Sequence, residues 1–204
     1  MRRVSLLAAG MIAACLLAPR PAAALAAGEV LAVKGEPAVE SGGKRTVVKI
    51  GDAVQVGDTL DVPAGAKLKL RMSDGSIISA ASGTRVTIES YTPEPRDAKL
   101  ALASGLLRAV VSAARQPSRF EVDTATGVAA VRSTDWFVQV QGNGTATQVG
   151  VLTGTVSLSS TATRRAVEIP ARWGARVEGG RDPVPARVWS QAEFDDVIQR
   201  TNAD

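Results

Sequence analysis

Alternation of apolar and polar residues with a period of two dominates the chain from residue 28 to residue 177. In an extended strand this period places successive side chains on opposite faces of a sheet. The clearest example is residues 67–72, where Leu68, Leu70 and Met72 point one way and the intervening basic residues point the other. The alternation recurs at residues 85–89, 99–102, 119–122, 136–140 and 155–158. The pattern predicts half-buried strands.

Short turns separate these predicted strands. Asp74-Gly75 lies between two apolar runs and is the strongest hairpin signal, followed by Gly-Asn-Gly at residues 142–144. Residues 91–97 contain two prolines among several charges and are predicted to form a surface crossover between two halves of the β structure. Residues 114–118 form a weaker break. About a dozen short strands are expected, so the fold class is all-β, and the spacing of the turns gives a weak hint of stacked β rungs, as in a solenoid.

The composition and the period both change near the C-terminus. Residues 179–187 are rich in glycine, proline and charge, which is typical of a linker. After them the apolar period becomes 3.6, which predicts a helix in the C-terminal segment, residues 188–204. The all-β domain is therefore expected to occupy residues 27–178.

The C-terminal helix has a clear start signal. Ser190 with Glu193 three residues later forms a capping box, and Trp189 with Phe194 occupies the positions of a hydrophobic staple. The predicted helix runs from residue 191 to about residue 200, with its apolar residues on one face. A helix of this length is marginal in water, so it must dock on the β body, dock on a partner or fray, and we favour docking on the β body.

The first 26 residues are predicted to be a cleaved signal peptide. Two arginines precede an apolar run at residues 4–18, and Ala24-Leu25-Ala26 has the form of a secretory cleavage site. The chain has 24 basic and 20 acidic residues, and removing the leader's three arginines leaves 21 against 20. The exported chain is then nearly neutral, so bulk charge does not argue for a polyanionic partner. This leader predicts a periplasmic protein.

Cys15 supports a competing interpretation of the leader. Ile12-Ala13-Ala14-Cys15 looks like the lipobox at which bacterial lipoproteins are cut and acylated. The apolar run continues past this cysteine and a well-formed cleavage site follows, which favours soluble export. An uncleaved anchor is the third alternative.

The residue types that most enzymes need are scarce. The chain has no histidine, and its single cysteine, Cys15, lies inside the predicted leader. A Ser-His-Asp hydrolase is therefore excluded, and the exported chain offers neither thiol nor imidazole. The sequence predicts a protein that is not an enzyme and has no catalytic, cofactor-binding or metal-binding residues.

Aspartates are the remaining candidates for a site. Asp52, Asp58 and Asp74 each adjoin a glycine, which is typical of an aspartate that caps its own turn. A Ca²⁺ site needs about six to eight oxygens from closely spaced positions, so no such site is predicted. The other aspartates considered are scattered along the chain: Asp123, Asp135, Asp195 and Asp196.

Basic residues and tryptophans give weaker signals. Lys44-Arg45, Arg164-Arg165 and Arg172 lie on predicted edges or loops, where charges usually keep strand edges soluble. Aromatic residues do not interleave with them, so no nucleic-acid partner is predicted. Trp136 and Trp173 have apolar neighbours and are predicted to lie in the core.

Short motifs follow one another in a fixed order over residues 28–178. They are Gly28-Glu29-Val30, Ile50-Gly51-Asp52, Val56-Gly57-Asp58-Thr59-Leu60, Leu68-Lys69-Leu70, Asp74-Gly75-Ser76, Val86-Thr87-Ile88, Gly105-Leu106-Leu107-Arg108-Ala109, Phe120-Glu121-Val122-Asp123-Thr124, Val131-Arg132-Ser133-Thr134-Asp135-Trp136-Phe137 and Leu152-Thr153-Gly154-Thr155-Val156. This order of motifs resembles the FecR domain family, a periplasmic β module of iron-uptake signal transducers and of stand-alone envelope proteins. Ser133 stands where that family usually has glycine.

The resemblance implies an all-β, solenoid-like or sandwich-like fold and a role in protein contacts, with no catalytic residues. Signal transducers of that family place a helical sigma-binding domain before a membrane span. Since only a few residues precede the apolar run here, we expect no directly bound sigma factor. The leading hypothesis is an exported, non-enzymatic signalling or scaffolding module that binds an envelope protein through strand edges and one face of its β body. The alternative is a binder of cell-wall glycan, such as peptidoglycan, or of lipid, through Trp173 and nearby arginines.

Overall fold

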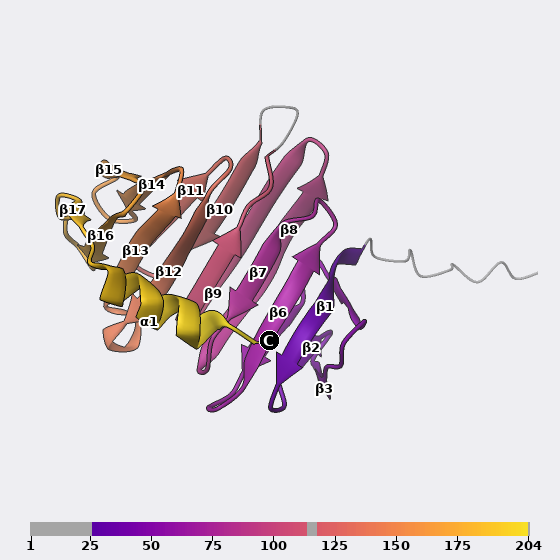
Figure 1. Cartoon of the computed structure of the whole chain (residues 1–204). Coiled ribbons are helices and arrows are strands. Elements are labelled where there is room, and N and C mark those ends of the chain that lie inside the picture. The colour runs from indigo at the N-terminus through magenta and orange to yellow at the C-terminus, as the bar shows by residue number, and fades with distance from the viewer. Residues whose placement is uncertain (1–25, 114–117, 204) are drawn as a thin grey trace, which may run out of the picture.

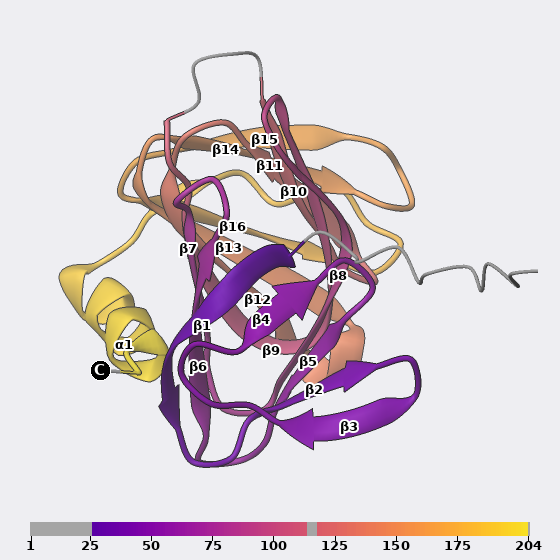
Figure 2. The same ribbon diagram turned by 90° about the vertical axis from the view of Figure 1, so that its right-hand side faces the viewer.

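The computed structural model describes residues 26–113 and 118–203. The predicted signal peptide, with Cys15, lies outside the described residues except for Ala26. The described chain forms seventeen strands, a short 3₁₀ turn η1 (Gly142–Gly144) and one helix, α1 (Gln191–Thr201). The strands form two layers, and α1 lies across the outside of one of them (Figure 1; Figure 2). The prediction of an all-β fold with one short C-terminal helix is confirmed.

The two layers are here called sheet A and sheet B, and the long strand β9 belongs to both. Among the described strands, every neighbouring pair is antiparallel except β9 and β10. Sheet A runs in the order β4 (Ala53–Gln55), β1 (Ala26–Lys34), β6 (Lys67–Met72), β7 (Ile77–Ala80), β9 (Arg96–Val110), β12 (Asp135–Gln141), β13 (Ala146–Thr153), β16 (Trp173–Glu178) and β17 (Arg187–Val188). Sheet B runs in the order β3 (Lys44–Val47), β2 (Ala38–Ser41), β5 (Thr59–Val62), β8 (Thr84–Pro93), β9, β10 (Arg119–Asp123), β11 (Gly127–Val131), β14 (Thr155–Ser160) and β15 (Ala166–Pro170).

Strand β9 changes sheets at Gly105. Up to Ser104 the strand pairs with β8, and from Gly105 onward it pairs with β12. Gly105 has a φ of +90°, a conformation that residues with a Cβ rarely adopt. A Cβ at this position would also overlap Thr84 of the neighbouring strand. The glycine therefore lets one continuous strand join the two sheets.

The main core lies between the two sheets. As the alternation predicts, Leu68, Leu70 and Met72 of β6 are buried, whereas the basic residues between them face outward. The largest fully buried side chains of this core come from both sheets and from both sides of β9: Leu60, Leu68, Leu70, Met72, Ile78, Ile88, Leu100, Leu102, Phe120 and Trp136. The two halves of the sequence therefore share one hydrophobic core.

Helix α1 docks on the outer face of sheet A, as expected. Ser190 and Glu193 form the predicted capping box. The staple residues Trp189 and Phe194 have ring centroids 5.6 Å apart. The ring centroid of Phe137 on β12 lies 5.1 Å from that of Trp189 and 6.3 Å from that of Phe194, so the three rings form one buried cluster under the helix.

Two departures from strict alternation mark the strands that α1 covers. In β12, Trp136 and Val138 belong to the core between the sheets, whereas Phe137 belongs to the cluster beneath α1. In β9, Leu107 belongs to the core between the sheets and Leu106 belongs to the cluster beneath α1. Because sheet A is buried on both faces here, continuous apolar runs replace the alternation.

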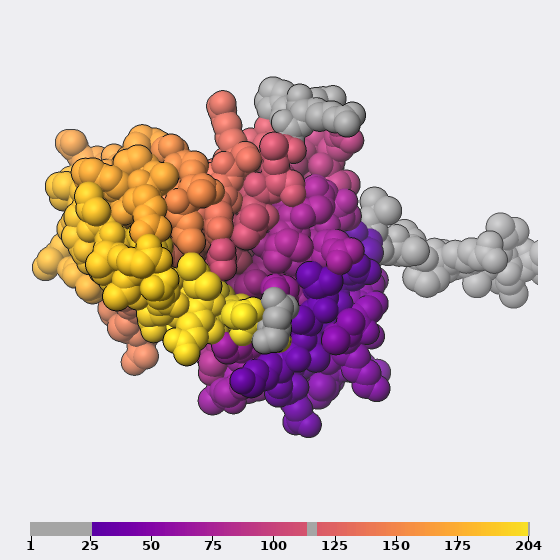
Figure 3. Space-filling model, in the orientation of Figure 1, coloured from indigo at the N-terminus to yellow at the C-terminus, as the bar shows by residue number. Residues whose placement is uncertain are grey.

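Lys67 holds the far end of α1. Its Nζ donates to the carbonyl oxygens of Gln199 (2.7 Å) and Asn202 (2.8 Å), at the terminus where helix carbonyls lack intrahelical partners. The helix starts beside β17 and ends at β6, so it crosses sheet A from its last strands to its early ones (Figure 1; Figure 3). Within the described residues, no helix has the length and apolar character that a membrane span requires.

The predicted surface crossover at residues 91–97 is wrong. Tyr91 pairs with Ala98 and Pro93 pairs with Arg96, so this segment is the tip of the β8–β9 hairpin. Proline fits a turn because no ladder N–H is needed there, and Arg96 is charged yet buried in an ion pair. The hairpins predicted at Asp74-Gly75 and at residues 142–144 are confirmed as β6–β7 and β12–β13.

Two other expectations concern segment boundaries. The predicted break at residues 114–118 lies outside the described residues except for Ser118, and the limits of the β domain stay predictions. Within the expected linker, residues 181–186 contain no helix or regular strand, but Arg187 pairs with Gly174 in the short strand β17.

Candidate functional site

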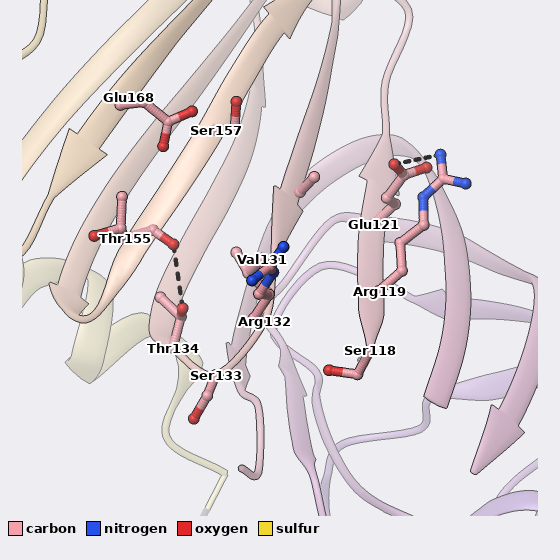
Figure 4. A pocket seen from close by; sticks show the side chains of 11 residues that line it. Ser118, Arg119, Glu121, Val131, Arg132, Ser133, Thr134, Thr155, Ser157 and Glu168 are labelled. Atoms are coloured by element: carbon pink, nitrogen blue, oxygen red, sulfur yellow. Dashed lines mark hydrogen bonds and ion pairs between the residues drawn. The ribbon is translucent and has the colours of Figure 1, made fainter. Parts of the chain in front are cut away.

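The outer face of sheet B is hollowed over β10, β11, β14 and β15. One open hollow of about 680 Å³ lies over these four strands (Figure 4). Its lining is Ser118, Arg119, Glu121, Ala130, Val131, Arg132, Ser133, Thr134, Thr155, Ser157 and Glu168. Most of the lining residues have polar side chains and none is aromatic, so the hollow offers many hydrogen-bonding groups to a ligand.

The hollow exists because small side chains line its floor. Ala130 of β11 is paired with Ser157 of β14, which is paired with Glu168 of β15, so the three form one row across the sheet. Because the side chains of alanine and serine are short, the protein surface is depressed in the middle of this row. Longer side chains stand on either side, Glu168 on β15 and Arg119 with Glu121 on β10.

A second hollow, of about 430 Å³, continues along the same face. It shares Arg119 and Glu121 with the first and extends over Val128 and Ser159 to Arg164. Val128 and Ser159 are paired across β11 and β14, two residues along from the row described above. Together the two hollows form one channel, here called the trough, that follows β11 and β14.

Most charges beside the trough neutralise one another. Arg119 and Glu121 are 2.5 Å apart, and the hydrogen bond to Glu121 raises the pKa of Arg119. Lys99 contacts Glu89 (2.9 Å) and Asp123 (3.0 Å), and these hydrogen bonds raise its pKa. These pairs are partly exposed, so each contributes little to stability.

One end of the trough is organised by the buried guanidinium of Arg96. Its Nη2 donates to Ser118 Oγ (3.0 Å) and to the carbonyl oxygen of Arg132 (2.5 Å), both of which belong to trough residues. Its Nη1 donates to Asp74 Oδ2 (2.8 Å) and to the carbonyl oxygen of Ser112 (2.7 Å). A single buried side chain thus fixes the backbone that presents Arg132.

Asp74 holds this arginine from the β6–β7 turn. Its carboxylate accepts hydrogen bonds from the Tyr91 hydroxyl (2.5 Å) and from both the N–H and the hydroxyl of Ser76. Burial alone would raise the pKa of Asp74, but the hydrogen bonds from Arg96, Tyr91 and Ser76 outweigh it and lower that pKa. Burial and the neighbouring carboxylate raise the pKa of Tyr91, so its hydroxyl stays a donor.

The lowered pKa of Asp74 predicts a loss of stability in acid. A carboxyl whose pKa is lower in the folded state than the ordinary 3.8 stabilises the fold above pH 3.8, and this contribution disappears as the pH falls through the folded pKa. We expect the free energy of unfolding to drop between about pH 5 and about pH 3, and to drop less in Asp74→Asn. Urea titrations over this range measure it, and parallel curves for the two proteins would contradict it.

The structure confirms the turn-capping role of three aspartates. The carboxylates of Asp52, Asp58 and Asp74 accept hydrogen bonds from the backbone N–H groups of Lys49 (2.8 Å), Gln55 (2.8 Å) and Ser76 (2.9 Å). The other aspartates lie in separate contacts: Asp123 with Lys99, Asp135 with Arg108, Asp195 with Gln191 and Asp196 with Arg200. In the described part of the chain, no three potential metal-ligating acids, histidines or cysteines gather.

Of the two tryptophan predictions, one is confirmed and one is wrong. Trp136 is fully buried in the core, as expected. The prediction for Trp173 is wrong, because this residue is 36% exposed and faces Val188 across the last pair of strands in sheet A. The strand lies near the sheet's edge, where only the two-residue β17 covers it. The alternation in sequence gave no sign of this end position.

The basic residues singled out in the sequence take different roles. Arg45 pairs with Asp61 at 3.2 Å, and Arg165 lies 3.5 Å from Asp182. The guanidinium of Arg172 lies 4.5 Å from the ring centroid of Phe194, where it helps to cover α1. Arg164 alone of this set lines the trough. Sequence reasoning missed the trough, although the low side chains Ala130 and Ser157 at outward strand positions were its visible signal.

The sandwich has an open strand edge at each end of each sheet. These edges are β3 and β15 in sheet B and β4 and β17 in sheet A. At β15, the Ser160 N–H donates to the Arg165 carbonyl oxygen (2.9 Å). Since inward and outward groups alternate along an antiparallel ladder, the N–H groups of Ala166 and Glu168 point away from β14. Among the described residues no backbone acceptor is found for either N–H, so both can pair with an added strand.

Two packed sheets with a shallow trough and open edges define a two-layer β module. The family model described as FecR protein matches residues 58–157, from the turn before β5 into β14. Over these residues the prediction of a FecR domain is confirmed, as the motifs indicated. The matched region includes part of the trough floor.

Solved structures support the fold. Two crystal structures from Parabacteroides distasonis ATCC 8503, at 1.65 and 2.50 Å resolution, are provisionally assigned as an anti-sigma factor. Each matches this chain with a TM-score of 0.57 at 15% identity, over 69% of this chain and 64% of the other. The match thus spans less than two thirds of that protein's length. No curated protein matches this chain significantly.

Proposed function

We propose that this chain is a non-enzymatic signalling or scaffolding module of the bacterial cell envelope, which binds another protein by adding a strand to the open edge of β15. The observation that carries the proposal is the pair of outward backbone groups at Ala166 and Glu168. Added strands gain affinity from main-chain hydrogen bonds and specificity from alternate side chains. The match to the FecR family model and the predicted leader support a place in the periplasm.

β15 is the best suited of the four open edges. Strand β3 carries Lys44 and Arg45, and charge of this kind blunts an edge against pairing. Strand β4 has three residues and β17 has two, so both edges are too short to pair stably with an added strand. Strand β15 has five residues, carries no basic side chain and borders the trough.

The variant Ala166→Pro tests this proposal, because it removes one outward N–H without removing a hydrogen bond to β14. We expect purified Ala166→Pro to lose most of the envelope-protein capture that the wild-type chain shows in quantitative pull-downs, while its unfolding temperature changes by only a few degrees. The matched control is Val47→Pro, on the outward side of β3, which should retain capture. Equal capture by Ala166→Pro and wild type would contradict the proposal.

One observation favours a second candidate function, the binding of cell-wall glycan or lipid. Trp173 is partly exposed, and Val188 opposite it is 61% exposed, so the end of sheet A presents an exposed apolar pair. Retention on purified peptidoglycan or on lipid vesicles separates this function from protein binding. This candidate requires that Trp173→Ala lose the retention while Ala166→Pro keeps it.

A further inference from the structure

Two arginines without partners stand at opposite ends of the trough. Arg132 lines the hollow near the start of β14, and Arg164 lines the hollow near its end. Both are exposed, and within the described residues neither guanidinium has a hydrogen-bond or ion-pair partner. Arg119 and Lys99, the other cations beside the trough, are paired with carboxylates. The free positive charge is therefore confined to the two ends.

The separation of these two arginines follows from the strand between them. Arg132 lines the same hollow as Thr155, and the backbone N–H of Arg164 donates to the Ser160 carbonyl oxygen (3.1 Å). From Thr155 to Ser160 an extended strand covers about 17 Å. On an extended peptide, side chains on one face lie an even number of residues apart, and separations of four and six residues, roughly 13 and 20 Å, bracket this span.

The chemistry of the trough fits a carboxylate at each end. Guanidinium groups bind carboxylates through a fork of two hydrogen bonds, which gives direction as well as charge. Between the arginines, the only carboxylate without a partner in the described lining is that of Glu168. It disfavours an acidic residue at the centre of a ligand and favours a basic one. The hydroxyl of Ser157 on the floor is available to main-chain groups.

A polypeptide fits this site better than a carboxylated sugar chain does. Neither hollow is lined by an aromatic ring on which a sugar could stack. The trough also runs parallel to β14, one strand away from the open edge of β15, so a partner that adds a strand to β15 brings its chain close to the trough. Arg132 and Arg164, at the two ends of the trough, favour a segment that carries an acidic side chain near each of them.

We infer that the trough binds an extended segment of a partner protein that carries two acidic side chains four or six residues apart, one at Arg132 and the other at Arg164. The inference rests on the proposed protein-binding function and specifies the chemistry of the partner. Arg96 acts as a positioning residue, because its hydrogen bond to the Arg132 carbonyl oxygen fixes the backbone at one end.

Fluorescence anisotropy with synthetic peptides tests the inference. The probes are fluorescein-labelled nonapeptides of serine, threonine and valine with two glutamates four or six residues apart, and matched peptides with glutamine at both positions. We expect the glutamate peptides to bind the wild-type chain at least tenfold more tightly than the glutamine peptides at low salt. Arg132→Gln and Arg164→Gln should each weaken glutamate-peptide binding about fivefold, an effect of the size of one exposed ion pair. The double variant should bind both peptides equally.

The matched control is Arg181→Gln, an exposed arginine outside the trough, which should bind as wild type does. Equal binding of glutamate and glutamine peptides by the wild type would overturn the inference, and so would tighter binding of oligogalacturonate, a carboxylated sugar probe. Envelope-protein capture is measured on the same variants. If Ala166→Pro abolishes capture and the arginine variants leave it intact, the trough inference fails while the edge proposal stands. If peptide binding depends on both arginines and capture survives Ala166→Pro, the edge proposal fails alone.

Discussion

Replacing Arg96 by methionine is expected to lower the free energy of unfolding by about 3–5 kcal/mol. The Arg96 side chain is 1% exposed and that of Asp74 is 7%, so the variant leaves a carboxylate buried without its cation. It also leaves the carbonyl oxygens of Ser112 and Arg132 without a donor. Chemical denaturation at neutral pH measures the loss.

Arg85→Met is the matched control for this prediction. Arg85 and Glu40 are 2.5 Å apart, but their side chains are 43% and 33% exposed. Water screens such a pair, so its loss should cost about 1 kcal/mol or less. An Arg96→Met variant that is no less stable than Arg85→Met would show that Arg96 does not hold the β6–β7 turn to the backbone at Ser112 and Arg132.

The variant Phe194→Ala should destabilise the protein by about 3–5 kcal/mol, because it leaves a cavity where a fully buried ring packs against two others. The loss should be cooperative with unfolding of the sandwich, since Lys67 ties the end of α1 to β6. Thermal unfolding followed by tryptophan fluorescence, which reports on Trp189 and Trp136, measures this effect.

Asp195→Ala, on the exposed side of the same helix, is the control for Phe194→Ala. It should change the free energy of unfolding by less than about 0.5 kcal/mol. Two separate transitions in wild-type protein, with α1 melting well before the strands, would contradict the view that the helix completes the fold.

Local sequence patterns predicted many individual elements of this fold. The alternation at residues 67–72 gave β6 and its buried face, and Asp74-Gly75 gave the turn to β7. The capping box of Ser190 and Glu193 gave the start of α1 to the residue. Each of these signals depends on residues a few positions apart, where backbone geometry alone restricts the structure.

The features that failed depend on distant pairing. Alternation shows that Trp173 lies on a strand face, but not that β16 is next to the end of its sheet. Arg96 sits in a charged, proline-rich segment that resembles a surface loop, and only its contacts with Asp74 and the carbonyl oxygen of Arg132 explain its burial. The dual role of β9 depends on Gly105, which the sequence shows only as one glycine among many.

The candidate site was the least predictable part for the same reason. The sequence indicated strand edges and one face of the β body as binding surfaces, without saying which. Ala130 and Ser157 are adjacent only because β11 and β14 pair across an intervening excursion of the chain through sheet A. The low floor of the trough, and the two free arginines at its ends, appear only once that pairing is known.

Strand addition at the edge of β15 is tested most directly by amide hydrogen exchange with and without the captured envelope partner. If the partner adds a strand there, binding slows exchange at the amides of Ala166 and Glu168 on β15, while the outward amides of β3 exchange as in the free protein. Slowed exchange confined to β16, β17 and α1, with β15 unchanged, would contradict it.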